Sequence, residues 1–353
     1  MLFDIAFFMY GLVSFLGFLG YFYSPKTAEQ KAENVEFVIP STADEKTGNC
    51  LKETVRELRK RFPEYRIWVV VDEGAKTSFD GATVVTVPDG FKGNRCKGRA
   101  LEYFRKYYAT PDKWYVFLDD DSYPLDDAFL HEICYYEEKG YVAANGVLLP
   151  RKGKSKLCHI LDHLRYWDDL FIFRLNTGLF KTPLIGFHGE LLIIKGSVLK
   201  EIPFSDSLVE DFVFAQRIVK KKYKTWQSKT KVSIKSPNRL KDLWRQRARW
   251  IKGILLELHK SNWMASLFIT FKVVGGITSS MILFPLWFLL PTTTFLSFFG
   301  IFGVTYYITS YIYGILKGGD LRYFLLLPIA GFFEPISLFY IPKTKDFTVI
   351  DKN

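Results

Sequence analysis

The sequence is poor in the residues that build disulfide or metal-bound frameworks. Its 353 residues include only four cysteines and five histidines. The cysteines form no C-x-x-C pair and no cluster with histidine, so neither a zinc site nor a disulfide framework is expected. They are typical of reduced, intracellular thiols. No internal repeat of the kind that builds transporters is visible.

Positive charge and apolar residues, by contrast, are abundant. Lys and Arg number 48 against 37 Asp and Glu, and 48% of the residues are hydrophobic. The excess charge favours anionic partners, which include phospholipid headgroups, nucleotide phosphates, pyrophosphate-linked lipids and nucleic acid. The length allows one substantial soluble domain with sequence left over for membrane segments.

An apolar stretch near the start of the sequence predicts a membrane anchor. At about 1.5 Å per residue, Ile5–Tyr23 is long enough to cross a hydrocarbon core. No Lys or Arg precedes it, and Lys26 and Lys31 follow it, which favours an uncleaved helix with its N-terminus outside. A buried helix of a soluble core is the alternative.

The last third of the sequence returns to apolar character. Val273–Leu290 and Phe295–Ile315 predict a membrane hairpin. A third stretch, Tyr323–Ile341, contains a central Glu334-Pro335 pair and is expected either to span the membrane or to re-enter it. Basic residues after the hairpin and in the tail predict a cytoplasmic C-terminus. With the N-terminus outside, this gives three full spans and leaves the last apolar stretch lying in or re-entering the membrane.

Between these regions, short β-rich runs alternate with amphipathic helical spacing, which predicts an α/β domain. Strands are predicted at Val35–Pro40, Ile67–Val71, Thr83–Val87, Trp114–Leu118 and Tyr141–Leu149. Helices are predicted at Leu51–Phe62, Arg99–Tyr108, Val209–Lys222 and Leu240–His259. In a sheet of this kind, chemistry belongs at the carboxyl ends of the strands.

Carboxylates follow two of the predicted strands directly. Asp119, Asp120 and Asp121 end one strand, and the first and third of them point the same way. They can converge on Mg²⁺ or Mn²⁺, which would also hold a diphosphate; a solvated acidic turn is the alternative. Asp72 ends another strand, where it can accept hydrogen bonds from a base or ribose, or belong to an ordinary turn.

A basic stretch with two glycines, Lys92–Arg99, leads into a predicted helix. Its cations and the amides of the helix N-terminus can cradle phosphates, although it has neither a P-loop nor a Rossmann glycine pattern. A charged surface loop is the alternative.

Two further short motifs carry candidate chemistry. In His188-Gly189-Glu190, the glycine indicates close backbone approach to a partner such as an acceptor sugar, and a buried core histidine is the alternative. Glu210-Asp211 opens a predicted helix. Asp211 is a candidate general base for sugar transfer with inversion, and simple complementation of the helix dipole is the alternative.

Cationic and aromatic residues alternate in Leu243–Trp250, just before the predicted hairpin. An interfacial helix explains this pattern, because tryptophan favours the headgroup zone and arginine meets lipid phosphate.

Taken in order, these residues resemble the inverting glycosyltransferases of family two, the group of the cellulose, chitin and hyaluronan synthases. The matching motifs are the nucleotide-contacting aspartate Asp72, the DxD motif Asp119-x-Asp121, the acidic pair Glu210-Asp211 and the QxxRW motif Gln246-x-x-Arg249-Trp250. The resemblance implies a GT-A type α/β fold, a Rossmann-like mixed sheet flanked by helices. It also implies transmembrane and interfacial helices in a minimal cellulose-synthase-like architecture.

The resemblance also implies roles for single residues. Asp211 would be the catalytic base, and Asp121 and Asp119 would hold Mg²⁺ or Mn²⁺. Contacts to the nucleotide sugar are implied for Pro40, Asp72, Lys97, Asp119, Asp120, Gln246, Arg249 and Trp250. Contacts to the acceptor are implied for His188, Gly189, Glu190, Glu210 and Trp250. The synthases commonly have cysteine or threonine with a glycine in this acceptor loop, and the chain departs from them there.

Within the family the chain is similar to the egghead-type β-1,4-mannosyltransferases and related archaeal enzymes, through Lys97–Tyr103 and Phe347–Lys352. This likeness implies GDP-mannose as donor and a lipid-linked oligosaccharide as acceptor, in N-glycan or glycolipid assembly. Three spans are too few to enclose a polymer pore, so a single addition is expected. Membrane lipids are expected partners and nucleic acid is not.

The expected location is the cell membrane or an endomembrane, with the catalytic domain in the cytoplasm. Three alternatives stay open: a synthase of a β-linked polysaccharide that uses UDP-glucose or UDP-N-acetylglucosamine, a membrane scaffold or transporter subunit, and a two-metal nucleotidyltransferase. The expected organisation is an N-terminal transmembrane helix (1–24), a catalytic domain (34–238), an amphipathic interface helix (239–262), a membrane region (263–341) and a cytoplasmic tail (342–353).

Overall fold

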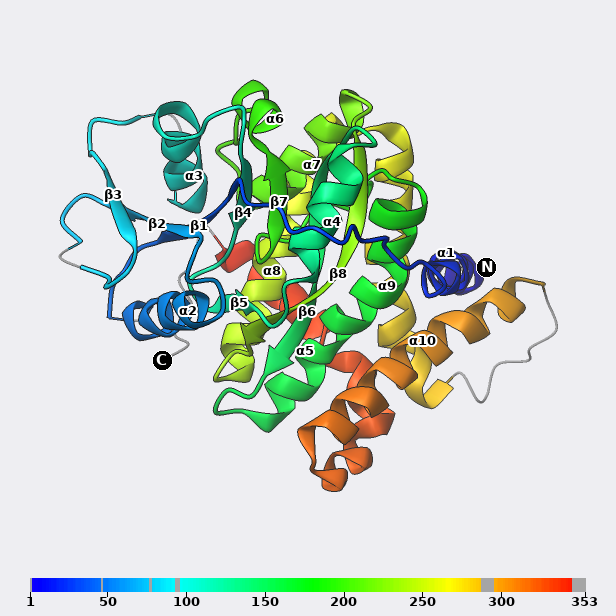
Figure 1. The fold of residues 1–353 in the computed structure, drawn as a ribbon. Helices are drawn as coiled ribbons and strands as arrows, with labels where there is room; N and C mark the ends of the chain where they lie inside the picture. Colours follow the sequence, from blue (N-terminus) through cyan, green and yellow to red (C-terminus); the bar gives the residue numbers. More distant parts are fainter. Residues whose placement is uncertain (1, 46, 76–77, 93–95, 287–294, 345–353) are drawn as a thin grey trace. The chain divides into compact units, whose positions relative to one another are not determined.

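A computed structural model describes residues 2–45, 47–75, 78–92, 96–286 and 295–344 (Figure 1). The chain forms two compact units. In their described parts, the α/β unit consists of residues 24–149 and 177–235, and the helical unit of residues 2–23, 150–176 and 236–344.

A mixed sheet forms the centre of the α/β unit, with eight strands in the described residues in the order β3-β2-β1-β4-β7-β6-β8-β5. The strands are β1 (Val35–Ser41), β2 (Arg66–Asp72), β3 (Thr83–Val87), β4 (Trp114–Phe117), β5 (Ser122–Pro124), β6 (Tyr141–Arg151), β7 (Leu192–Lys195) and β8 (Lys224–Lys235). Strands β3, β2, β1 and β4 are parallel, whereas β7 pairs antiparallel with β4 and β6, and β5 antiparallel with β8.

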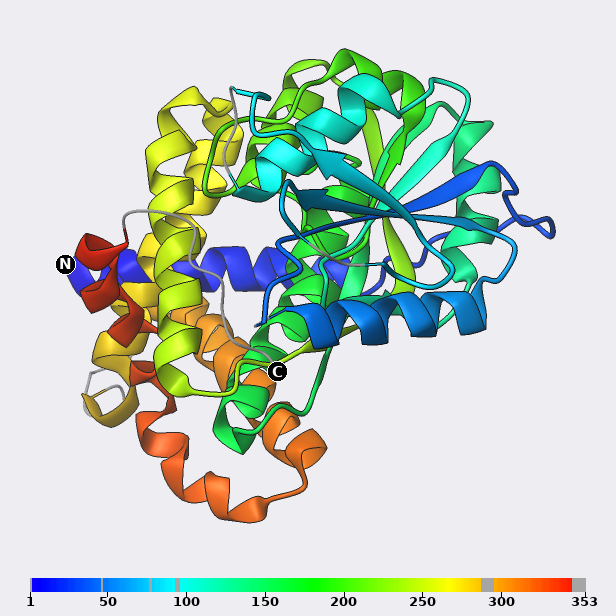
Figure 2. The same ribbon diagram turned by 90° about the vertical axis from the view of Figure 1, so that its left-hand side faces the viewer.

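Helices cover both faces of this sheet. The helices of the unit are α2 (Gly48–Arg61), α3 (Cys96–Tyr107), α4 (Ala128–Glu137), α6 (Gly196–Glu201) and α7 (Glu210–Lys220). Side chains alternate along a strand, so Phe37 and Ile39 of β1 pack with α2 and α4, while Val38 packs with α3, α6 and α7. Figures 1 and 2 show α2 and α3 on opposite sides of β1 and β2.

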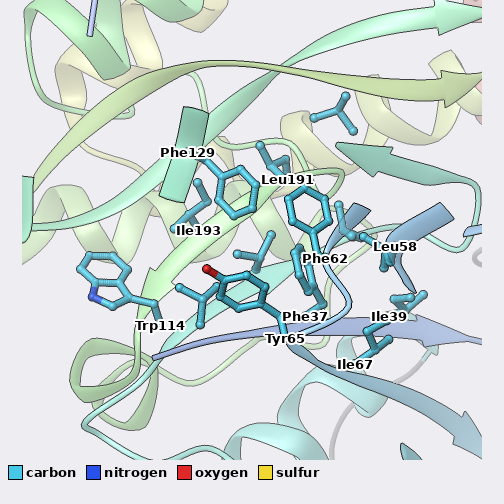
Figure 3. Packing of buried hydrophobic residues seen from close by; sticks show 14 of the residues in the cluster. Phe37, Ile39, Leu58, Phe62, Tyr65, Ile67, Trp114, Phe129, Leu191 and Ile193 are labelled. Atoms are coloured by element: carbon cyan, nitrogen blue, oxygen red, sulfur yellow. The ribbon is translucent and has the colours of Figure 1, made fainter. Parts of the chain in front are cut away.

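Aromatic packing dominates the α2 and α4 face. The rings of Phe37, Phe62 and Phe129 meet at centroid distances of 5.2 to 6.1 Å (Figure 3). Each fully buried phenylalanine contributes roughly 1.5–3 kcal/mol through removal of apolar surface from water. This core fixes β1 and β4 side by side, and both strands end at the candidate site.

The predicted fold class is confirmed, because the sheet is mixed and helices flank it. All five predicted strands are present with bounds that differ by at most two residues at either end. The sequence did not predict β5, β7, β8, α4 or α6.

The helical unit is built from α1 (Leu2–Gly20), α5 (Lys156–Asp168), α8 (Leu240–Glu257), η2 (Leu258–Lys260), α9 (Trp263–Leu286), α10 (Phe295–Gly318), η4 (Leu321–Phe332) and η5 (Pro335–Lys343). A π-helix, η1 (Asp169–Leu179), continues α5. Helix α1 packs against α9 and α10, and Gly11 lies so near the carbonyl group of Phe299 that a Cβ there would overlap it. Such close backbone contact is typical of packed apolar helices.

Length and composition mark one described helix, Phe298–Gly318, as able to cross a membrane. The pair formed by Leu321–Phe332 and Pro335–Lys343, bent by 55°, passes the same test together as a broken span or a re-entrant loop. Phe7–Gly20 and Trp263–Ile277 are shorter apolar helices. The three full spans, the orientation and the domain boundaries expected from the sequence stay predictions.

Candidate active site

The candidate site lies in the α/β unit, where the parallel strands β1, β2 and β4 end. Ser41 closes β1, Asp72 closes β2, and Asp119 to Asp121 follow β4. These strands are neighbours in the sheet and run in the same direction. The carboxyl ends of parallel strands meet at one edge, so the polar residues that follow them share that edge.

The three aspartates after β4 form a tight turn and face different partners. The hydroxyl of Ser122 accepts a hydrogen bond from the Asp119 backbone N–H at 3.0 Å. The carboxylate of Asp120 accepts one from Ser41 Oγ at 2.6 Å, and its carbonyl oxygen accepts one from Thr54 Oγ1 at 3.0 Å. Asp120 therefore ties the turn to β1 and α2, two contacts that the sequence did not indicate.

Asp121 is the deepest of the three, with 2% of its surface exposed. No group of three or more His, Cys, Asp or Glu side chains arranged for a metal ion occurs in the described part of the chain. Two carboxylates nevertheless fit Mg²⁺ or Mn²⁺ chemically, because such ions commonly take one or two carboxylates and complete their shell with phosphate oxygens and water. The donor set of Asp119 and Asp121 is of this kind.

Lys97 joins the aspartate turn to the Glu210-Asp211 motif. From the first turn of α3, its ammonium group forms an ion pair with Asp119 and lies 3.7 Å from Glu210 Oε1. Burial alone would lower the pKa of Lys97, but the carboxylates of Asp119, Glu210 and Asp211 together raise it above its ordinary value. Lys97 therefore stays positively charged at any working pH.

The His188-Gly189-Glu190 segment reaches the same cluster. The His188 backbone N–H donates to Asn145 Oδ1 of β6 at 2.8 Å, which fixes the segment. A Cβ on Gly189 would overlap the Lys97 ammonium and lie 3.5 Å from Asp119 Oδ1. The close backbone approach predicted for this glycine is present, and its partner is the Lys97–Asp119 pair.

Asp211 occupies the first turn of α7, where its Oδ1 accepts a 2.8 Å hydrogen bond from the Phe212 backbone N–H. Burial raises the pKa of the Asp211 carboxyl, and the Glu190 carboxylate adds to this rise. Lys97 and the Phe212 N–H oppose the rise without cancelling it. A carboxylate with a raised pKa accepts a proton more readily, which is what a general base needs.

Asp72 lies at the same sheet edge but has a different partner. Its side chain is 45% exposed and forms an ion pair with Arg99 of α3. Arg99 also donates to the carbonyl groups of Pro88 at 2.6 Å and Phe91 at 3.1 Å, so it fixes the loop after β3. The sequence did not single out Arg99, although it stands two residues after Lys97 in the basic stretch.

The other predicted site residues are placed as follows. Pro40 is buried inside β1, in register with Val70 of β2. Gln246, Arg249 and Trp250 lie on α8 in the helical unit, with Gln246 buried. Residues 93–95 of the basic stretch and the Phe347–Lys352 segment lie outside the described residues.

Comparison with known proteins places the chain among glycosyltransferases. Residues 114–333 match the model of a family described as glycosyl transferase family group 2. The chain is 27% identical over 261 residues to the β-1,4-mannosyltransferase bre-3 of Caenorhabditis elegans, an alignment that covers 68% of this chain and 56% of the relative. It is 25% identical over 258 residues to the β-1,4-mannosyltransferase egh of Drosophila melanogaster, with the same coverage.

The chain thus spans just over half the length of these curated relatives. Among solved structures it is similar to a mannosyltransferase from Pyrobaculum calidifontis, whose structure holds GDP-Man and Mn²⁺. The TM-score is 0.57 and the identity 13%, with 98% of this chain and all of the other covered. At this identity the likeness establishes the fold, which is the GT-A type expected from the sequence.

Proposed function

Because the chain belongs to glycosyl transferase family group 2, we propose that it is an inverting, metal-dependent membrane glycosyltransferase. It transfers mannose from GDP-mannose in β-1,4 linkage to a lipid-linked oligosaccharide. One observation carries the proposal: Lys97 brings Asp119 of the aspartate turn together with Glu210 and Asp211 of α7. These residues are up to 114 positions apart in the sequence, and the fold gathers their charges around one ammonium group.

The names of the similar proteins support the choice of donor. The curated relatives are called β-1,4-mannosyltransferases, and the similar archaeal structure contains GDP-Man and Mn²⁺. A divalent cation held by Asp119 and Asp121 would neutralise the diphosphate as it leaves the sugar. Lys97 adds a fixed positive charge beside that position, and Asp72 with Arg99 offers polar groups to the base and ribose.

Helix α7 and the segment around Gly189 would supply the groups that act on the acceptor. Inversion requires one group to take the proton from the attacking hydroxyl while the donor diphosphate departs. Asp211 suits that task, because it is half-buried, its pKa is raised and Lys97 balances its charge. Glu190 and Glu210 lie in the same charged cluster and would hydrogen-bond acceptor hydroxyls.

The proposal is tested by comparing donors on the purified full chain in detergent with Mn²⁺ present. We expect a larger thermal shift with GDP-mannose than with UDP-glucose or UDP-N-acetylglucosamine, because a ligand that binds only the folded state stabilises it. We expect GDP, and no pyrophosphate, as the by-product of transfer. A stronger shift with a UDP-sugar would refute the mannose assignment, and released pyrophosphate would indicate a nucleotidyltransferase.

The role of Asp211 is tested by Asp211→Asn, which keeps the side-chain shape and removes the proton acceptor. We expect transfer to fall by at least a factor of about 10³ while donor and metal binding stay near wild type. Glu201→Gln is the matched control, because Glu201 is an exposed carboxylate of the same unit whose partners are Lys221 and Tyr223. Loss of donor binding in Asp211→Asn would contradict the assignment.

A further inference from the structure

The Glu334-Pro335 pair has a buried partner on the QxxRW helix. Arg247 of α8 lies with its Nε 3.4 Å from Glu334 Oε2 and with Nη2 3.0 Å from Asp162 Oδ1 of α5. Asp162 is fully buried and also accepts a hydrogen bond from Ser236 Oγ at 3.2 Å. A carboxylate in an apolar segment is costly unless it is paired, so this contact accounts for Glu334 in that position.

Helix α8 holds the break between η4 and η5 by two polar contacts. The indole of Trp244 donates to the carbonyl oxygen of Phe333 at 2.8 Å. Arg247 binds the carboxylate of the next residue, Glu334. The break frees backbone carbonyl groups that an intact helix would satisfy, and Trp244 supplies a donor for one of them, that of Phe333.

The same face of α8 carries Trp250. Residues three apart on a helix are neighbours, so Trp244, Arg247 and Trp250 form one row. The Arg247 guanidinium lies 4.6 Å from the centroid of the Trp250 ring, and that of Arg165 lies 4.9 Å from it. Stacked cations hold an indole ring at a defined angle, and the contact strengthens when it is shielded from water.

The guanidinium of Arg247 therefore contacts both Glu334 at the helix break and the ring of Trp250. Its Nη1 and the Oε1 of Glu334 are buried without a hydrogen-bond partner among the described residues. We propose that Arg247 is a positioning residue: Asp162 and Glu334 hold its guanidinium, and the guanidinium sets the angle of the Trp250 ring, so that the η4–η5 break controls the acceptor step.

This inference rests on the proposed function only in its kinetic consequence. The family resemblance implies contacts of Trp250 with both the nucleotide sugar and the acceptor, and we propose that the angle of the ring matters for the acceptor contact. Glu334→Gln keeps the side-chain shape and removes the charge, and Arg247→Lys keeps the charge and removes the planar group. For each we expect the acceptor KM to rise about tenfold while the donor KM changes less than twofold, since small misplacements of a contact group carry penalties of this size.

The matched control is Lys156→Gln. Lys156 forms an ion pair with Asp320 at 3.2 Å in the same unit and belongs to α5, as Asp162 does. We expect both KM values to stay at wild-type level in this variant. Equal rises in donor and acceptor KM for Glu334→Gln would overturn the inference, because a general loss of structure moves both.

A second measurement does not depend on activity. In a Trp244→Phe background, which removes the indole bound to the Phe333 carbonyl group, we expect Glu334→Gln to change the tryptophan emission of the full chain. We expect the same substitution to leave the emission unchanged when Trp250→Phe is also present. A change that persists without Trp250 would overturn the inference. If no sugar is transferred from any donor, the proposed function fails and the emission comparison still decides the role of Arg247. If Arg247→Lys does not fold, Glu334→Gln carries the test alone.

Discussion

Glu132 should make the stability of the α/β unit depend on pH between about 4.5 and 7. This glutamate of α4 is fully buried and accepts hydrogen bonds from Trp226 Nε1 at 3.1 Å and from the Lys229 backbone N–H at 3.0 Å. Burial raises the pKa of its carboxyl from 4.5 to about 7, although Ser228 and these two donors lower it in part. Both donors belong to β8. This strand pairs with β5, which directly follows the aspartate turn.

The magnitude follows from the two pKa values. A difference of one pH unit corresponds to about 1.4 kcal/mol, so the rise from 4.5 to about 7 corresponds to roughly 3 kcal/mol. The folded chain binds this proton more tightly than the unfolded chain does. The contribution of Glu132 to stability is therefore complete below pH 4.5, decreases as the pH rises, and is lost above about pH 7.

The assay is denaturant unfolding of the wild type and of Glu132→Gln from pH 4.5 to 8. Glutamine keeps the shape of the side chain and removes its charge, but its NH₂ group cannot accept from one of the two N–H donors, so we expect the variant to be less stable than the wild type at pH 4.5 by about 1–3 kcal/mol. Between pH 4.5 and 8 we expect this difference to shift in favour of the variant by up to about 3 kcal/mol, because only the wild type loses stability as Glu132 ionises. Glu201→Gln should keep the wild-type slope in this window, because ion pairing and hydrogen bonding lower the pKa of Glu201. Parallel curves for wild type and Glu132→Gln would refute the reasoning.

Three further predictions concern the candidate site. In Gly189→Ala, the new Cβ should displace the Lys97 ammonium and weaken donor binding about tenfold at unchanged melting temperature. If Gly189 acts through Lys97, adding Gly189→Ala to Lys97→Met should cause no further loss of donor binding. Additive losses of donor binding would contradict this. Asp121→Ala should abolish metal-dependent donor binding, and unchanged Mn²⁺ affinity in the presence of nucleotide would exclude ligation there. Asp120→Ala should lower the free energy of unfolding by about 1–3 kcal/mol, because Ser41 loses its acceptor, and should affect metal binding less than Asp121→Ala does.

Local sequence patterns predicted the parallel half of the sheet well. Strand β3 was predicted with its observed bounds, and β1, β2 and β4 to within one residue. Strands β1, β2 and β4 are apolar runs buried on both faces for most of their length, and such runs are visible in the sequence. Strand β3 lies at the edge of the sheet and is partly exposed, and its β-branched residues indicated it. Strand β8 was missed, because residues 225–228 are buried without alternation and only Lys229 and Lys231 alternate with buried residues.

Among the site residues, the sequence by itself determined the motifs and their order. Asp72, the aspartate turn and the Glu210-Asp211 pair were identified because carboxylates after apolar runs and at a helix start are local signals. Only the tertiary structure decided which side chain each motif meets: Lys97 beside Asp119 and Glu210, Ser41 on Asp120, and Arg247 between Asp162 and Glu334. The physical reason is that chain packing brings these charges together across long sequence separations, and no local pattern records the partner of a charged side chain.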